Sequence, residues 1–118
     1  MNTHLPALDP LLHQPARTQL VAYLSGRGET TFTELKRVLG VTDGNLGAHL
    51  AKLVEAGYVA TGEATGGGRA QTVYVLTPSG RTALAEYVAR LSRLMALSAG
   101  GETTNGQDPV SNPQEVTP

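Results

Sequence analysis

Two short amphipathic helices with a tight turn between them are the most restrictive feature of this sequence. Thr31 and Glu34 have the spacing of a capping box at the start of the first helix. Gly40 can adopt the left-handed conformation that ends a helix, and Thr42 can cap the next helix at once. Because the connection "LGVT" leaves so few residues between the helices, the sequence predicts a helix-turn-helix over about 31–57.

The segments on either side predict a small mixed fold. A helix is expected to begin at Pro15, because proline suits the first helical turn, where an N–H group would have no partner anyway. After the helix-turn-helix, β-prone residues on both sides of a glycine-rich centre predict a hairpin over about 58–76. Thr77 and Pro78 then begin a final helix over about 77–98. We therefore predict a mainly α fold with a small β-hairpin (α+β), which is a winged helix-turn-helix with a C-terminal dimerisation helix.

Charge is unevenly distributed along the chain. Residues 1–99 contain all nine Lys and Arg and seven Asp and Glu, a net charge of +2, whereas residues 100–118 contain three acidic residues and no basic one. The second segment is rich in Gly, Pro, Thr, Asn and Gln, and it has too little apolar surface to offset the entropy lost on ordering. We predict one winged helix domain over 1–99 and a disordered acidic tail over 100–118.

Several functional classes lack their sequence signals here. The chain has no cysteine, which excludes disulfides, thiolate zinc sites and cysteine nucleophiles. No nucleophile elbow, phosphate-binding glycine loop or metalloprotease helix is found, so we do not expect an enzyme. The histidines are far apart in sequence, and we expect neither a metal nor another cofactor. Without a long apolar run or a signal-peptide pattern, a cytoplasmic protein with no membrane partner is expected.

The second helix of the motif has two different faces. Its apolar residues Leu46, Leu50, Leu53 and Val54 recur at helical spacing and are expected in the core. The other side presents small and polar residues, namely Gly44, Asn45, Gly47, Ala48, His49 and Lys52. Each glycine costs about 1 kcal/mol of helix stability relative to alanine. Because glycine has no Cβ atom, these positions would let the helix backbone approach another molecule closely.

The run "FTELKRVLGVTDGNLGAHLAKLVEAGYV", followed by "GGGRAQTVYVLTPSGRTAL", resembles the small winged-helix transcriptional regulators of the MarR and ArsR types. The resemblance covers roughly residues 10–97. It implies a homodimer that binds double-stranded operator DNA in a sequence-specific manner. It also implies that the recognition helix, 42–56, enters the major groove and that the wing, 65–70, reaches the minor groove.

The exposed groups in these segments are few but suited to DNA. Asn45 can bond bidentately to adenine or donate to a phosphate, His49 can donate to guanine or phosphate, and Lys52 is expected at the DNA backbone. Arg69, at the predicted wing tip, suits the negative potential of a narrow minor groove. Thr42 and the amides of the first turn can bind a phosphate at the positive end of the helix. Further candidate phosphate contacts are Thr31, Thr33, Lys36 and Arg37.

The last helix carries more apolar residues than one face can place against a single domain. We expect it to pair with a second copy through a dimer interface made of Leu84, Tyr87, Val88, Leu91, Leu94 and Met95. A single winged helix module makes few phosphate contacts. Two modules on adjacent half-sites add their contacts together and so bind DNA more tightly.

Two other functions remain open from the sequence. The low positive charge fits a winged helix that contacts another protein, although such a module would be expected to show apolar or acidic residues where Asn45, His49 and Lys52 lie. The other alternative is an effector-sensing regulator with a small-molecule pocket at the dimer interface, which Tyr58, Tyr74 and Tyr87 could line. The identity of such an effector is unknown.

Overall fold

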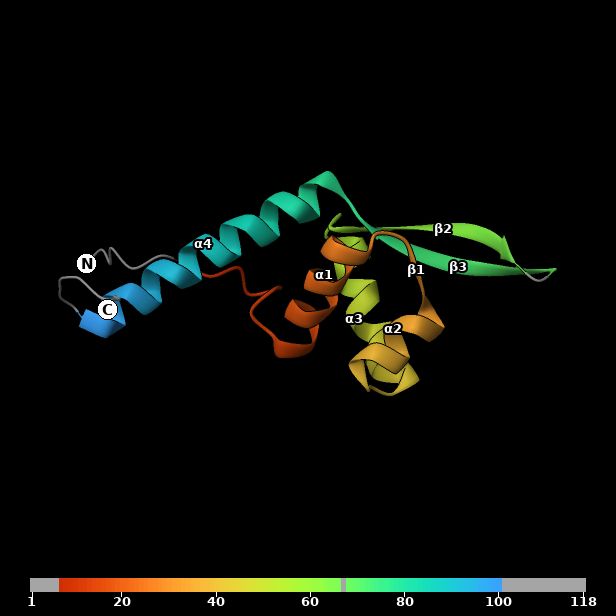
Figure 1. Ribbon diagram of the computed structural model, residues 1–118, viewed down its shortest axis with the longest axis horizontal. Coiled ribbons are helices and arrows are strands. Elements are labelled where there is room, and N and C mark those ends of the chain that lie inside the picture. Colours follow the sequence, from red (N-terminus) through yellow and green to blue (C-terminus); the bar gives the residue numbers. More distant parts are fainter. Residues whose placement is uncertain (1–6, 67, 101–118) are drawn as a thin grey trace, which may run out of the picture. The chain divides into compact units, whose positions relative to one another are not determined.

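The computed structural model describes residues 7–66 and 68–100. Within these residues the chain forms α1 (Pro15–Arg27), β1 (Thr30–Thr31), α2 (Phe32–Leu39), α3 (Asp43–Glu55), β2 (Val59–Gly66), β3 (Arg69–Leu76) and α4 (Pro78–Gly100) (Figure 1). This order confirms the predicted α+β fold of a winged helix-turn-helix. Apart from Gly100, which ends α4, the predicted acidic tail lies outside the described residues. No helix in the described ranges has the length and apolar character needed to cross a membrane.

The chain divides into two units. One unit comprises Leu8–Tyr87, and the other includes α4 from Val88 onward. The unit Leu8–Tyr87, called the first unit below, contains the core. Its buried apolar residues come from all its helices, from β2 and β3, and from the segment before α1: Leu12, Leu20, Val21, Leu24, Leu35, Leu46, Leu50, Leu53, Val59, Val73, Leu76 and Tyr87. This core is almost entirely aliphatic, as the scarcity of aromatic residues requires.

The turn of the helix-turn-helix forms as its sequence predicts. Gly40 has φ +67° and donates its N–H to the Lys36 carbonyl, which ends α2. Thr42 then accepts a hydrogen bond from the Asn45 N–H at 3.1 Å and so caps α3. Both caps satisfy backbone groups that the helix ends leave without an intrahelical partner.

The start of α2 differs from the prediction in one respect. Thr31 accepts from the Glu34 N–H at 3.1 Å, which is the first half of the capping box. The Glu34 carboxylate accepts hydrogen bonds from the Tyr23 hydroxyl and from Arg27, with Arg27 Nε at 2.9 Å. These two donors hold the pKa of Glu34 below its ordinary value. Glu34 therefore joins α2 to α1, which requires residues that a local capping pattern does not include.

The hairpin is part of a three-stranded antiparallel sheet in the order β1-β3-β2. β2 and β3 pair along their whole length, from Val59 opposite Leu76 to Gly66 opposite Arg69. In Figure 1 these two strands lie side by side and extend past α2 and α3. The short strand β1 was not predicted, because Thr30 and Thr31 pair with β3 more than 40 residues later in the chain.

The junction between the wing and α4 is tightly packed. Thr77 donates its N–H to the Tyr58 carbonyl at 3.0 Å and its hydroxyl to the Gly57 carbonyl at 2.6 Å. The same hydroxyl accepts from the Gly80 N–H at 3.0 Å, which confirms Thr77 as the N-cap of α4. A Cβ atom at Gly80 would lie 2.3 Å from the Tyr58 carbonyl oxygen. A glycine is therefore required where the first turn of α4 passes the start of the wing.

Candidate nucleic-acid interface

Helix α3 buries one side and leaves the predicted contact residues accessible. Leu46, Leu50 and Leu53 are at most 3 % exposed. The prediction that Val54 belongs to the same buried face is wrong, since Val54 is 39 % exposed. Of the predicted contact residues, Gly44, Asn45, Ala48 and Lys52 are exposed, and Gly47 and His49 are half-buried. The leucines thus fix the rotation of α3 and present its small and polar residues outward.

The two glycines of α3 have open space where a side chain would stand. A Cβ atom at Gly44 or Gly47 would meet no heavy atom within 4 Å. Neither glycine has the positive φ that would require this residue type. Within the described part of the chain, the fold itself therefore gives no reason for glycine at either position.

The N-terminus of α3 combines a cap, exposed amides and an ion pair. The cap engages one lone pair of the Thr42 hydroxyl, which leaves its hydrogen available to an outside acceptor. Asp43 pairs with Lys36 of α2 at 2.7 Å, with both side chains largely in solvent. This pair neutralises the one negative charge in the first turn of α3. It also engages Lys36, a predicted phosphate contact. Arg37 beside it is exposed as well.

His49 has a neighbour that the sequence did not indicate. Arg17 of α1 places Nη1 3.1 Å from His49 Nδ1. Burial lowers the pKa of His49 below its ordinary value, and the positive charges of Arg17 and Lys52 lower it further. Arg17 and His49 are separated by 32 residues in sequence. No local pattern could have linked them, because the contact depends on how α1 packs beside α3.

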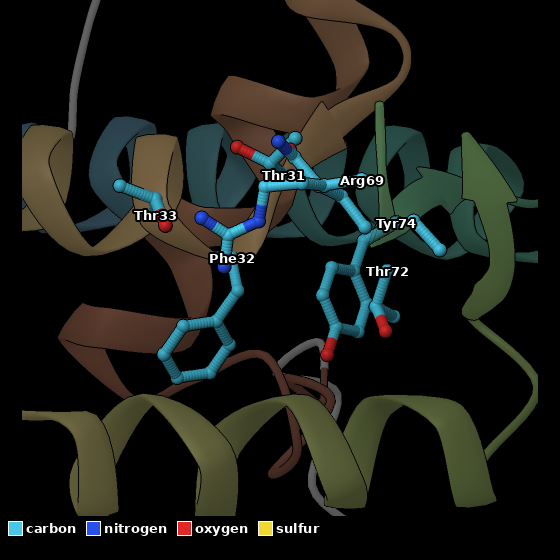
Figure 2. Close-up of a pocket in the computed structure, with 8 residues that line it drawn as sticks. Thr31, Phe32, Thr33, Arg69, Thr72 and Tyr74 are labelled. Carbon is cyan, nitrogen blue, oxygen red and sulfur yellow. The ribbon is translucent and has the colours of Figure 1, made fainter. Parts of the chain in front are cut away.

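The wing arginine lies beside the start of α2. Arg69, Ala70, Gln71, Thr72 and Tyr74 of β3 line a hollow of about 440 Å³ together with Thr31, Phe32 and Thr33. In Figure 2 the Arg69 side chain extends over the space between β3 and the beginning of α2. The structure therefore brings the wing arginine and two of the predicted phosphate contacts, Thr31 and Thr33, to one polar hollow. An arginine flanked by hydroxyl groups is suited to bind an anionic oxygen.

The tyrosines do not gather in one pocket within the first unit. Tyr58 donates to Asp9 Oδ2 at 2.6 Å, and this hydrogen bond, with burial, raises the pKa of Tyr58 to about 12. Tyr87 is 6 % exposed, and its hydroxyl lies 3.0 Å from His13 Nδ1. Tyr74 lines the polar hollow and also an apolar hollow of about 400 Å³ beside α3. Tyr58 and Tyr87 thus have partners in their own chain.

Among the residues that the structure describes, no group of three or more His, Cys, Asp and Glu side chains could hold a metal ion. The accessible features instead belong to a helix-turn-helix followed by a wing with a basic residue at its tip. That arrangement defines the winged helix class of DNA-binding domains.

Comparison with known proteins agrees with this class. Residues 16–95 match the family described as winged helix DNA-binding domain, and the chain belongs to this family. It is 36 % identical over 84 residues to an uncharacterised protein, MJ0432, of Methanocaldococcus jannaschii. The aligned region covers 71 % of this chain and 91 % of that protein.

Solved structures show the same fold. A transcriptional regulator homologue from Pyrococcus horikoshii superposes with a TM-score of 0.70 at 26 % identity, covering 75 % of this chain and 87 % of that one. A mutant of MarR from E. coli, in complex with operator DNA, superposes with a TM-score of 0.64 at 24 % identity, covering 75 % and 63 % of the two chains. The predicted resemblance to MarR-type regulators is confirmed at the level of the fold.

Proposed function

We propose that this protein is a sequence-specific transcriptional regulator that binds double-stranded DNA as a homodimer. Helix α3 enters the major groove, and the hairpin tip with Arg69 reaches the adjacent minor groove. The observation that carries this proposal is the outward face of α3. There two glycines lie without any internal reason for their presence, beside the exposed Asn45 and Lys52. A close-fitting backbone with a few polar side chains is suited to a groove.

The charges near α3 are compatible with phosphate. The exposed Lys36–Asp43 pair offsets part of the repulsion that an isolated Asp43 would exert on the DNA backbone. Thr42 and the first-turn amides remain directed outward at the positive end of the helix dipole. Arg37 of α2 and Arg69 of β3 are exposed and add positive charge to the helix-turn-helix and to the wing.

The dimer is proposed from the second half of α4. Val88 is 52 % exposed and Met95 is 63 % exposed, and Leu91 and Leu94 between them are half-buried. Tyr87 contributes its surface to its own chain, so the proposed interface depends mainly on these four residues. Two copies joined through α4 would bring two α3 helices to one DNA molecule, as the two half-sites of a dimeric regulator require.

Gly47→Ala is expected to raise the stability of the protein and to lower its affinity for DNA. We expect the variant to be more stable by about 0.5–1 kcal/mol, because alanine is the better helix former and its methyl group meets open space. We expect its affinity for an enriched DNA site to fall about tenfold, because the methyl group holds α3 away from the base edges. Thermal denaturation and fluorescence anisotropy measure the two effects.

Gly26→Ala is the matched control for Gly47→Ala. Gly26 lies in α1 and also has open space around its Cβ position. The control should gain the same stability and bind DNA as the wild type does. Equal DNA affinity in both variants would contradict close approach by α3.

Arg69→Ala tests the wing. We expect affinity to fall about 5-fold to 150-fold and the preference for A·T pairs beside the half-site to disappear, because an arginine in a narrow minor groove is lost. Arg93→Ala removes the same charge from an exposed position of α4 and should leave both properties unchanged. If Arg69→Ala binds like the wild type throughout a salt titration, the wing has no part in recognition.

A further inference from the structure

Arg17 is held from two sides at the flank of α3. Its Nε donates to the Leu11 carbonyl at 2.6 Å, on the segment before α1. Its Nη1 lies 3.1 Å from His49 Nδ1. Because the guanidinium group is rigid and planar, the two contacts together restrain its orientation, and Nη1 is directed at one particular nitrogen of the imidazole ring.

The chemistry of this contact determines where the ring proton of His49 resides. A guanidinium group has five N–H donors and no acceptor, and it does not lose its proton in a protein. His49 Nδ1 must therefore accept the hydrogen bond with its lone pair. In neutral histidine the remaining proton is then on Nε2. Protonating Nδ1 would direct an N–H at the N–H of Arg17 and break the contact.

The charged groups around His49 favour the same state. Arg17 of α1 and Lys52 of α3 are both positive, and each opposes a second proton on the ring. Partial burial of the ring acts in the same direction and contributes most to the lowered pKa. His49 is thus neutral at a pH where an exposed histidine would be partly charged.

We propose that Arg17 is a positioning residue that holds His49 in the Nε2–H tautomer, so that α3 presents His49 to DNA solely as a hydrogen-bond donor. A donor at this position pairs with the acceptors of the major groove, which are purine N7, guanine O6 and thymine O4. It finds no partner in the amino groups of adenine and cytosine. The hydrogen bond from His49 to a base rests on the proposed function, whereas the tautomer of His49 is a property of the protein without DNA.

The free protein provides the first test. In the full chain labelled with 15N, the two ring nitrogens of His49 differ in chemical shift according to which one carries the proton. The signals are assigned by their absence in His49→Gln. We expect the wild type to show a single Nε2–H tautomer and to titrate below the range of an ordinary histidine. In Arg17→Met, which keeps the aliphatic stem and removes every donor, we expect mixed tautomers and a higher pKa for His49.

Arg93→Met is the control for the titration. Arg93 is exposed on α4, and its replacement should leave the His49 signals as they are in the wild type. A wild-type ring with its proton on Nδ1, or an Arg17→Met ring that behaves like the wild type, would overturn the tautomer assignment.

The second test measures which base pairs the wild type and two variants prefer. Wild type, Arg17→Met and His49→Gln are each used to select duplexes from the same random pool. We expect both variants to lose about 5-fold to 150-fold discrimination at one position per half-site, and at the same position. A uniform loss of affinity across all sequences in Arg17→Met would assign Arg17 to phosphate or to stability and overturn the positioning role. Failure of the wild type to enrich any duplex would instead contradict the proposed function, with the tautomer result standing by itself.

Discussion

Gly80→Ala is expected to destabilise the first unit by about 3 kcal/mol, near the upper end of the usual cost of overpacking. The added Cβ atom would lie 2.3 Å from the Tyr58 carbonyl oxygen and 2.7 Å from Leu76 Cδ1. Leu76 can rotate, but the Tyr58 carbonyl cannot move freely, because it accepts the N–H of Thr77. Relief of the clash therefore requires the start of α4 to separate from the start of β2.

Chemical denaturation of Gly80→Ala measures this cost, and Gly26→Ala serves as the control. Both changes replace a helical glycine by alanine, but the Cβ position of Gly26 is open. Helix propensity alone would stabilise both variants by about 0.5–1 kcal/mol. If Gly80→Ala is as stable as Gly26→Ala, the close packing of α4 on the Tyr58 backbone is not a feature of the protein in solution.

Leu91→Glu is expected to convert the proposed dimer into a monomer. In the proposed interface Leu91 lies between Val88 and Met95, so each copy would place a glutamate charge in an apolar contact, where burial of a charge is costly. Operator affinity should fall about 100-fold to 10,000-fold, because the second half-site no longer binds at the high effective concentration that linkage provides. Light scattering measures the mass, and anisotropy measures the affinity.

Ala89→Glu adds the same charge two residues earlier. Residues two apart on a helix lie on nearly opposite sides, and Ala89 is exposed. This variant should remain a dimer with the affinity of the wild type. A dimer that survives Leu91→Glu would place the interface elsewhere.

The parts of the fold that the sequence predicted correctly are those governed by nearby residues. Pro15 begins α1, Gly40 ends α2, and Thr42 and Thr77 cap the helices that follow them. Each of these preferences depends on groups within about four residues. The three leucines of α3 were predicted in the core because the helical period alone determines which side they share.

The features that the sequence did not predict involve partners far along the chain. Strand β1 forms because Thr30 meets Tyr74, and Glu34 bonds to α1 and not back to Thr31. The contact between Arg17 and His49 and the packing of Gly80 against Tyr58 are of the same kind. Such contacts depend on how elements pack together, and one sequence contains no local signal for them.

The proposed function requires that two α3 helices read two half-sites of DNA. Selection of bound duplexes from a random pool, at physiological ionic strength with the full chain, measures this. We expect an enriched palindrome whose half-sites are about 10 base pairs apart from centre to centre, with affinity that falls steeply as salt increases. Enrichment of no sequence would contradict the proposed function and favour a winged helix that contacts another protein.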